Sequence, residues 1–160
     1  MLTTFRNDLN FRYFLLIMIS FFSVVVVSAQ PNYRFEHLSK NEGLSQGTVN
    51  AIYQDINGLM WFGTKDGLNR YDGHEIKVFR RNFNDSLSLP NNHILSINQD
   101  KTGRLWIGTF GNNLSYFDPI TEMFYNWKNF VSEEDDINIG DKIFCIEINH
   151  QNNKLLAGSD

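Results

Sequence analysis

The chain has 160 residues, of which 42% are hydrophobic, and its 14 basic and 18 acidic side chains give a formal net charge of −4 at pH 7. This composition is typical of a globular protein and excludes a disordered polymer. The basic residues are scattered, with only Arg80 and Arg81 adjacent, so the sequence offers no basic stripe for a nucleic-acid backbone.

The first predicted element is a targeting segment. Arg6 and Arg12 precede an apolar run over residues 14–27, which ends in small residues before a polar boundary. This order is typical of a secretory signal peptide, here predicted over residues 1–29 with cleavage after Ala29. The 14 residues of the run would span about 21 Å as a helix, short of the roughly 30 Å hydrocarbon core. An uncleaved anchor is therefore the weaker alternative, followed by a buried core helix, and the mature chain is expected outside the cytoplasm.

The rest of the chain repeats at an offset of 45 residues. Residues 49–64 align with residues 94–109, with seven of 16 positions identical. A third, degenerate copy begins near Ile143 and has Leu156 in place of the tryptophan. A period of this length is typical of the four-stranded blade of a β-propeller. The predicted fold is all-β, a β-propeller that is incomplete in this chain, with two blades and the start of a third.

The propeller domain is predicted over residues 30–160. Positions 49, 52 and 53 also fit helical spacing, but the segment is short and bounded by turn residues, which favours a strand. A lone strand at 33–38 is expected to complete the last blade. The blade-like units are predicted at 44–80, 89–127 and 139–160, and the strands of the first unit at 49–53, 59–63, 68–71 and 75–79.

The positions that recur between the units are interpreted as structural. Asp55 and Asp100 occupy the same repeat position, and recurrence favours turn capping over calcium binding or catalysis, because an active site is made once. Trp61 and Trp106 are interpreted as core between blades, with sugar stacking as the alternative. The structural repeat positions are Asp55, Gly58, Trp61, Gly63, Thr64, Asp72, Gly73, Asp100, Gly103, Trp106, Gly108, Thr109 and Asp118.

The sequence predicts no catalytic residue, no metal site and no cofactor, and it leaves the ligand-binding residues unknown. The four histidines form no metal-binding pair. The acidic run at 133–136 is interpreted as solvated loop, with calcium binding as the alternative. Trp127 and the turns at 65–67 and 110–113 are better placed for a surface contact. Cys145, the single cysteine, is expected to be a small buried side chain in a strand.

The residues of the first unit resemble a known family. They combine turn dipeptides, a tryptophan and the repeat period in one dense pattern that includes Asn57-Gly58, Trp61-Phe62-Gly63-Thr64 and Arg70-Tyr71-Asp72-Gly73. The pattern is similar to the two-component regulator propeller repeat, and the resemblance covers residues 33–160. It implies the periplasmic sensing region of a hybrid two-component sensor histidine kinase from a glycan-degrading bacterium.

The resemblance implies more than the residues show. Members of the family carry two propellers, a β-sandwich, a membrane helix and cytoplasmic kinase modules, many with a receiver and a DNA-binding domain. Their periplasmic part binds oligosaccharides, through residues that tend to lie in later blades than those of this chain. The full-length protein is accordingly expected to be a homodimer anchored in the inner membrane, and this chain to be its N-terminal part.

Three classes of function remain open on the sequence. The leading hypothesis is a non-catalytic sensor, whose mark would be a later membrane span followed by kinase motifs. A secreted propeller hydrolase or lyase would instead need acidic or histidine residues that converge from further blades. A protein-interaction scaffold would end after ring closure with neither feature.

Overall fold

The computed structural model describes residues 11–17, 33–111, 114–130 and 139–160. It divides into two compact units, Met1–Glu36 and His37–Asp160. In the first unit, residues 11–17 are helical, and no helix in the described ranges is long and apolar enough to cross a membrane. Most of the predicted signal peptide, including its cleavage after Ala29, lies outside the described residues.

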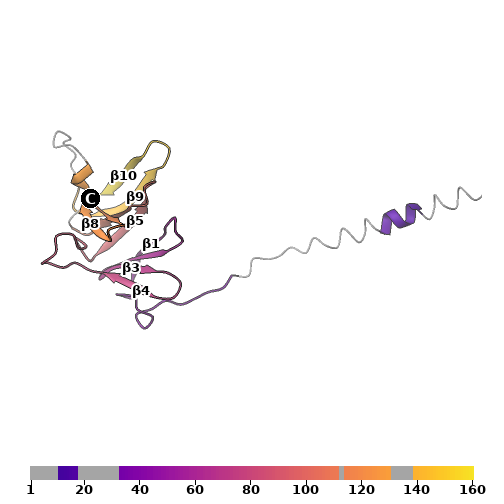
Figure 1. Ribbon diagram of the computed structural model, residues 1–160, viewed down its shortest axis with the longest axis horizontal. Coiled ribbons are helices and arrows are strands. Elements are labelled where there is room, and N and C mark those ends of the chain that lie inside the picture. The colour runs from indigo at the N-terminus through magenta and orange to yellow at the C-terminus, as the bar shows by residue number, and fades with distance from the viewer. Residues whose placement is uncertain (1–10, 18–32, 112–113, 131–138) are drawn as a thin grey trace, which may run out of the picture. The chain divides into compact units, whose positions relative to one another are not determined.

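The second unit consists of antiparallel sheets in which each strand pairs with the next along the chain (Figure 1). The predicted all-β fold of propeller-like blades is confirmed. The first sheet contains β1 (Val49–Gln54), β2 (Met60–Thr64), β3 (Gly67–Tyr71) and β4 (Ile76–Phe79). The second contains β5 (Ile94–Gln99), β6 (Leu105–Thr109), β7 (Leu114–Asp118) and β8 (Met123–Asn126), and the third pairs β9 (Ile143–Asn149) with β10 (Lys154–Ser159).

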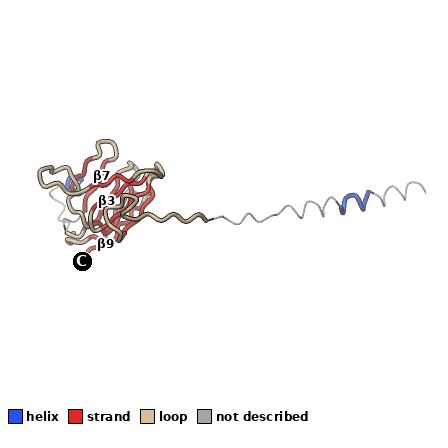
Figure 2. The backbone as a smooth tube through the Cα atoms, turned by 90° about the horizontal axis from the view of Figure 1, so that it is seen from below, coloured by secondary structure: helices blue, strands red, loops and turns tan. Residues whose placement is uncertain are grey.

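The first strands of the three sheets lie side by side, so the sheets stack face to face in chain order (Figure 1). Figure 2 shows the strands of this unit gathered together, with the loops around them. Trp61 and Phe79 of the first sheet meet Phe117 and Phe124 of the second, and the Trp61 and Phe117 ring centroids are 5.3 Å apart. A second apolar cluster, centred on Trp106, joins the second and third sheets. Both clusters lie between neighbouring sheets, so the core of the unit lies between the blades. Each fully buried apolar side chain in them stabilises the stack by about 1.5–3 kcal/mol.

Three local expectations are wrong. Residues 33–38 form no strand: no described strand pairs with them, and Phe35 is 93% exposed. The outer strand of the second unit, predicted over residues 123–127, is β8 and ends at Asn126, because Trp127 begins a short 3-10 helix, Trp127–Phe130. Cys145 is exposed rather than buried. Its counterpart in the second sheet, Ser96, is buried because β9 covers it, whereas no described strand covers Cys145 in the same way.

One face of the first sheet lacks a neighbour among the described residues. Ile52 is 63% exposed, whereas Ile97, at the same repeat position, is only 8% exposed because the first sheet covers it. The same contrast separates Met60, Tyr71 and Ile76, which are half-buried, from their buried counterparts Leu105, Phe117 and Phe124. This leading face has the pattern of an inter-blade surface, and apolar surfaces of that kind are association sites.

Residues 30–160 expressed alone are therefore expected to self-associate, and Ile52→Lys is expected to raise the monomer fraction. Ile97→Lys is the matched control, since it places the same charge at the same repeat position inside the core. Ile97→Lys should unfold the protein rather than raise the fraction of folded monomer, because it buries a charge without a partner. Size-exclusion chromatography with light scattering measures both effects. A monomeric, sharply melting unsubstituted protein would contradict the interpretation of the leading face.

Candidate functional site

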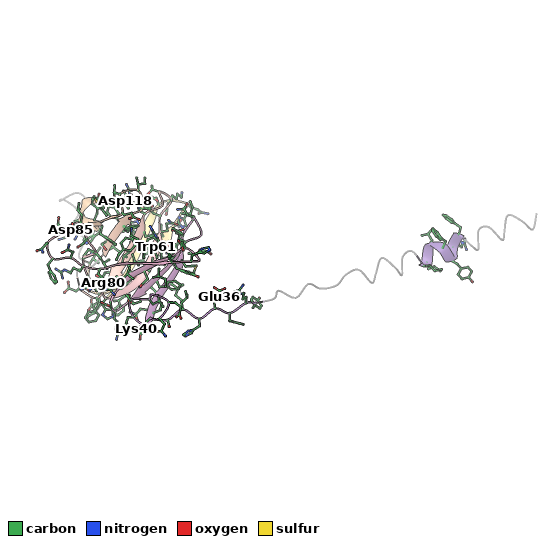
Figure 3. The ribbon with its side chains drawn as sticks, turned by 60° about the horizontal axis from the view of Figure 1, so that its bottom comes forward. Glu36, Lys40, Trp61, Arg80, Asp85 and Asp118 are labelled. Carbon is green, nitrogen blue, oxygen red and sulfur yellow. The ribbon has the colours of Figure 1, made fainter. Side chains whose placement is uncertain are left out.

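Asp55 lies directly after β1 and joins the following turn to the core. Its Oδ1 accepts the backbone N–H groups of Asn57 and Leu59, both at 2.9 Å. Its Oδ2 accepts the indole N–H of Trp61 at 2.8 Å, and the Trp61 side chain is almost fully buried. Figure 3 shows Trp61 within the body of the unit. One carboxylate thus satisfies both the turn and the buried tryptophan.

Asp100 repeats this arrangement in the second sheet. Its Oδ1 accepts the backbone N–H groups of Thr102 and Arg104 at 2.8 and 3.1 Å, and its Oδ2 accepts the Trp106 indole N–H at 2.9 Å. Both carboxylates are therefore engaged by the fold. Each side-chain oxygen of the two aspartates accepts at least one hydrogen bond from its own blade, as expected for turn capping.

The third copy loses the carboxylate and the tryptophan together. Leu156 pairs with Glu147 in the register in which Trp106 pairs with Asn98, and Leu156 is 52% exposed. Asn149 takes the place of the aspartate, and its Oδ1 still accepts a turn N–H, from Gln151 at 2.8 Å. An amide is sufficient to cap the turn, so the carboxylate is retained only where an indole N–H must also be bound.

Two repeated glycines allow adjacent blades to approach closely. A Cβ built on Gly63 would lie 2.5 Å from Ile94 Cγ2, in the first strand of the next sheet. A Cβ on Gly108 would lie 2.5 Å from the carbonyl oxygen of Ile143, again in the first strand of the next sheet. Both contacts are shorter than real side chains permit, so the second strand of each blade requires glycine at this position.

The remaining repeat positions also serve turns. The Oγ1 atoms of Thr64 and Thr109 donate to the carbonyl oxygens of Gly67 and Gly111, at 3.0 and 2.6 Å. The turn glycines have positive φ angles and the turn aspartates accept backbone N–H groups, which accounts for Gly58, Gly103, Gly73, Asp72 and Asp118.

An ion-pair cluster that the sequence did not indicate joins the outer strands of the first two sheets. Glu122, in the turn between β7 and β8, accepts a hydrogen bond from Arg70 at 2.8 Å and is also paired with Lys77. The guanidinium of Arg70 in turn lies 5.8 Å from the centroid of the Trp61 ring. The hydrogen bond from Lys77, with that from Arg70, lowers the pKa of Glu122 against a smaller opposing effect of burial.

Glu122→Gln is expected to destabilise the seam between the first two sheets by about 0.5 kcal/mol, since the pairs are partly exposed. Because folding lowers the pKa of Glu122, its ion pairs contribute fully to the free energy of unfolding at pH values above the ordinary carboxyl pKa of about 4.3. It is lost as pH falls through the lowered value. Thermal unfolding at pH 7 and pH 3 tests this. An equal difference between wild type and variant at both pH values would contradict it.

The turn at 65–67 and residues 110–111, which begin the second turn, lie at the end of the sheets where the segments leading into the next sheet begin. Gly67 N donates to Asn92 O and Phe110 N donates to His93 O, at 2.8 and 2.9 Å. The ring of half-exposed Phe110 stacks on His93, with centroids 5.0 Å apart, and Lys142 Nζ lies 5.1 Å from the Phe110 centroid. Burial, with a smaller effect of Lys65, lowers the pKa of His93. Aromatic and cationic groups therefore meet at this surface, while residues 112–113 lie outside the described ranges.

Trp127 is not the surface residue that its position suggested. Its side chain is 6% exposed and belongs to the cluster between the second and third sheets. Among the described residues, no group of three or more His, Cys, Asp or Glu side chains could hold a metal ion. The acidic run at 133–136 lies outside them.

Two segments of the chain match the family model of the two component regulator propeller: residues 43–66 and 88–111. These segments are two-component regulator propeller repeats. They contain the bond from aspartate to tryptophan, the close-contact glycine and the threonine of each blade. The third unit, in which Asn149 and Leu156 replace the aspartate and the tryptophan, lies outside the matched ranges.

A curated relative is similar to half of the chain. Histidine kinase P4 of Formosa agariphila is 41% identical over 80 residues, which are 50% of this chain and 6% of the relative. The chain thus spans a small fraction of the length of that kinase.

Solved structures share the propeller-repeat fold. The extracellular domain of BT3049, described as a hybrid two component system of B. thetaiotaomicron, has a TM-score of 0.63 and 26% identity, over 72% of this chain and 16% of that one. The extracellular domain of BT4673, a second such system, has a TM-score of 0.55 and 20% identity, over 79% of this chain and 17% of that one. The second likeness concerns the fold alone.

Proposed function

We propose that this chain is the N-terminal part of the extracytoplasmic, ligand-sensing propeller of a hybrid two-component sensor kinase. The observation that carries the proposal is the 41% identity to a histidine kinase over 80 residues, half of this chain. The extracellular domains with the same fold belong to two-component systems, which supports a location outside the cytoplasm. A predicted signal peptide over residues 1–29 and a periplasmic position are part of this proposal.

The proposed ligand is an oligosaccharide released from a polysaccharide, as the family resemblance implies. The repeated aspartates and tryptophans support a ligand site elsewhere, because their polar atoms are already bound within the blades. Contacts to the ligand would come from further blades of the ring. The full-length protein would be a homodimer, anchored in the inner membrane by a helix downstream of this chain.

Signalling in this scheme requires that the ligand bind one arrangement of the propeller region more tightly than another, since only differential affinity shifts a conformational equilibrium. The described blades suit the role of a rigid frame. Close glycine contacts and side-chain bonds between first strands, such as that from Asn50 Nδ2 to Ile94 O at 2.9 Å, fix each sheet against the next. Movement of one blade would therefore be transmitted to its neighbours.

The experiment measures autophosphorylation of the full-length gene product in membrane vesicles. Oligosaccharide pools from digested polysaccharides are added on the periplasmic side, and the constituent monosaccharides are the control. We expect one pool to change the rate of phosphate incorporation from ATP while the monosaccharides do not. Cleavage of the oligosaccharides without any phosphorylation would contradict the proposal and indicate a secreted hydrolase or lyase.

A further inference from the structure

The loop between β4 and β5 presents a phenylalanine to solvent. Phe83 is 85% exposed and belongs to neither apolar cluster between the sheets. The loop connects the two sheets whose four strands are all described, so its place in the fold is set by these two blades. A single exposed apolar side chain is common. The rigidity of this loop and the charges on both sides of the ring distinguish Phe83 from such a side chain.

The loop is held in one conformation although it is exposed. Asn82 O accepts the Asp85 N–H at 3.1 Å, which closes a turn with Phe83 in it. Ser88 Oγ accepts the Asn82 N–H at 2.9 Å, and Leu87 O accepts the backbone N–H of the β8 residue at position 124, also at 2.9 Å. A loop that is ordered in advance loses little conformational entropy when it binds.

An arginine covers one side of the exposed ring. The guanidinium carbon of Arg81 lies 4.4 Å from the centroid of the Phe83 ring. Arg81 makes no ion pair with a described residue, whereas its neighbour Arg80 is paired with Asp66 at 3.1 Å. Arginine and aromatic side chains are enriched in protein–protein contacts, and the guanidinium fork matches a carboxylate. The pair is therefore suited to a partner that brings an apolar group and a carboxylate.

The same loop carries a carboxylate on the other side of the ring. Asp85 is exposed and lies at the edge of the unit in Figure 3. Its Oδ1 accepts the Leu87 N–H at 2.9 Å, and its Oδ2 has no hydrogen-bond partner among the described residues. Residues 81–85 thus read Arg-Asn-Phe-Asn-Asp, with opposite charges at equal distances from Phe83. This order is self-complementary.

Self-complementarity identifies the partner. The turn places Arg81 on one arm and Asp85 on the other. A two-fold axis perpendicular to the plane of the turn would bring Phe83 against Phe83 of a second copy and each Arg81 opposite Asp85 of the other copy. An acidic ligand would bind Arg81 but would be repelled by Asp85, whereas a second copy pairs both charges.

We propose that the loop over residues 81–85 is a contact between two copies of this chain, with Phe83 at the two-fold axis and an Arg81–Asp85 pair on each side of it. One loop buries far less than the roughly 1,200 Å² of a stable interface. The contact therefore adds to a dimer that is also held elsewhere, where the second copy is present at a high effective concentration. The inference rests on the homodimer of the proposed function and requires neither kinase activity nor ligand binding.

Disulfide cross-linking of the full-length gene product in membrane vesicles tests the contact. Phe83→Cys is compared with Ile120→Cys, which places a thiol at a 91% exposed position in another turn. Both variants carry Cys145→Ser, because Cys145 is exposed, and Cys145→Ser alone is the background. Two cysteines form a disulfide when their Cα atoms lie within about 7 Å. We expect at least roughly tenfold more covalent dimer from Phe83→Cys than from Ile120→Cys, because the contact raises the local thiol concentration.

Two outcomes of this experiment separate the contact from the homodimer. A full-length protein that is monomeric by light scattering in detergent would overturn both. A dimer in which Phe83→Cys forms no more disulfide than Ile120→Cys would overturn the contact alone.

Charge exchange in the Phe83→Cys protein tests the chemistry of the partner. Arg81→Asp should lower the yield of covalent dimer, and Arg81→Asp combined with Asp85→Arg should restore it, because both pairs form again with the charges exchanged. Asp85→Asn, whose amide oxygen can still accept the Leu87 N–H, should also lower the yield. Lys101→Asp is the control at an exposed turn and should change nothing. A combined variant no better than Arg81→Asp alone would overturn the second copy as partner and indicate an acidic ligand or another protein.

Discussion

Gly108→Ala is expected to lower the free energy of unfolding of the propeller region by about 3 kcal/mol. The new Cβ would meet Ser96 Oγ and lie 2.5 Å from the carbonyl oxygen of Ile143. Because that oxygen belongs to the backbone of β9, relief requires the third sheet to move away from the second. The Ser96 Oγ–H also donates to the same oxygen at 3.0 Å, so a bond between the sheets would be lost.

Gly47→Ala is the matched control for this substitution. No atom lies within 4 Å of the position of its Cβ, so the change should stay within about 0.5 kcal/mol. Urea unfolding of the propeller region of the full-length protein, followed by circular dichroism, compares the two variants. Equal midpoints for Gly108→Ala and Gly47→Ala would contradict the close-contact role of the repeated glycine.

Asp55→Ala is expected to cost about 2–4 kcal/mol, because it removes the acceptor of two turn N–H groups and of a buried indole N–H. Asp55→Asn should cost less, about 1–2 kcal/mol, since its amide oxygen can cap the turn while its NH₂ faces the indole donor. The third copy already shows this division, with Asn149 at the turn and no tryptophan to bind.

The Asp55 effect is measured by a double-mutant cycle with Trp61→Phe, which removes the indole donor. Asp85→Ala is the surface control: Asp85 accepts one turn N–H, from Leu87 at 2.9 Å, and lies at the edge of the unit in Figure 3. It should cost about 0.5–1 kcal/mol. A coupling energy near zero between Asp55→Asn and Trp61→Phe would show that the carboxylate and the indole act independently, against the structure.

The propeller fold was predictable because the evidence for it repeats. Each of the first two blades places a capping aspartate, a core tryptophan and a close-contact glycine at fixed spacing, and a chance match would not reproduce all three in two aligned copies. Strand boundaries were off by at most one residue, since the pleated segments and their turns share polar residues at the junctions. The expected strand at 33–38 was wrong because a single extended segment without a partner leaves its backbone groups unpaired.

Features that depend on contacts between blades were not predictable. Glu122 lies in a turn with a φ of 55°, and its partners Arg70 and Lys77 are more than 40 residues away in sequence. Nothing in the local pattern distinguishes it from a solvated glutamate. Cys145 shows the same limit, because its exposure depends on whether a further strand covers the outer side of β9.

The candidate ligand site stayed open for a related reason. The residues that the sequence could single out are those that recur, and the structure shows that recurring residues serve the blade itself. A ligand site is made once, from side chains that need not repeat. The meeting of His93, Phe110 and Lys142 at one end of the sheets became visible only once the turns were placed in space.

The central claim, that these blades begin the sensing region of a two-component kinase, is tested most directly by sequencing the gene downstream of the codon for Asp160. The account predicts an open frame that encodes further regulator propeller repeats, a membrane-spanning helix and a histidine kinase. A frame that ends after the propeller closes, with no membrane helix and no kinase, would contradict it.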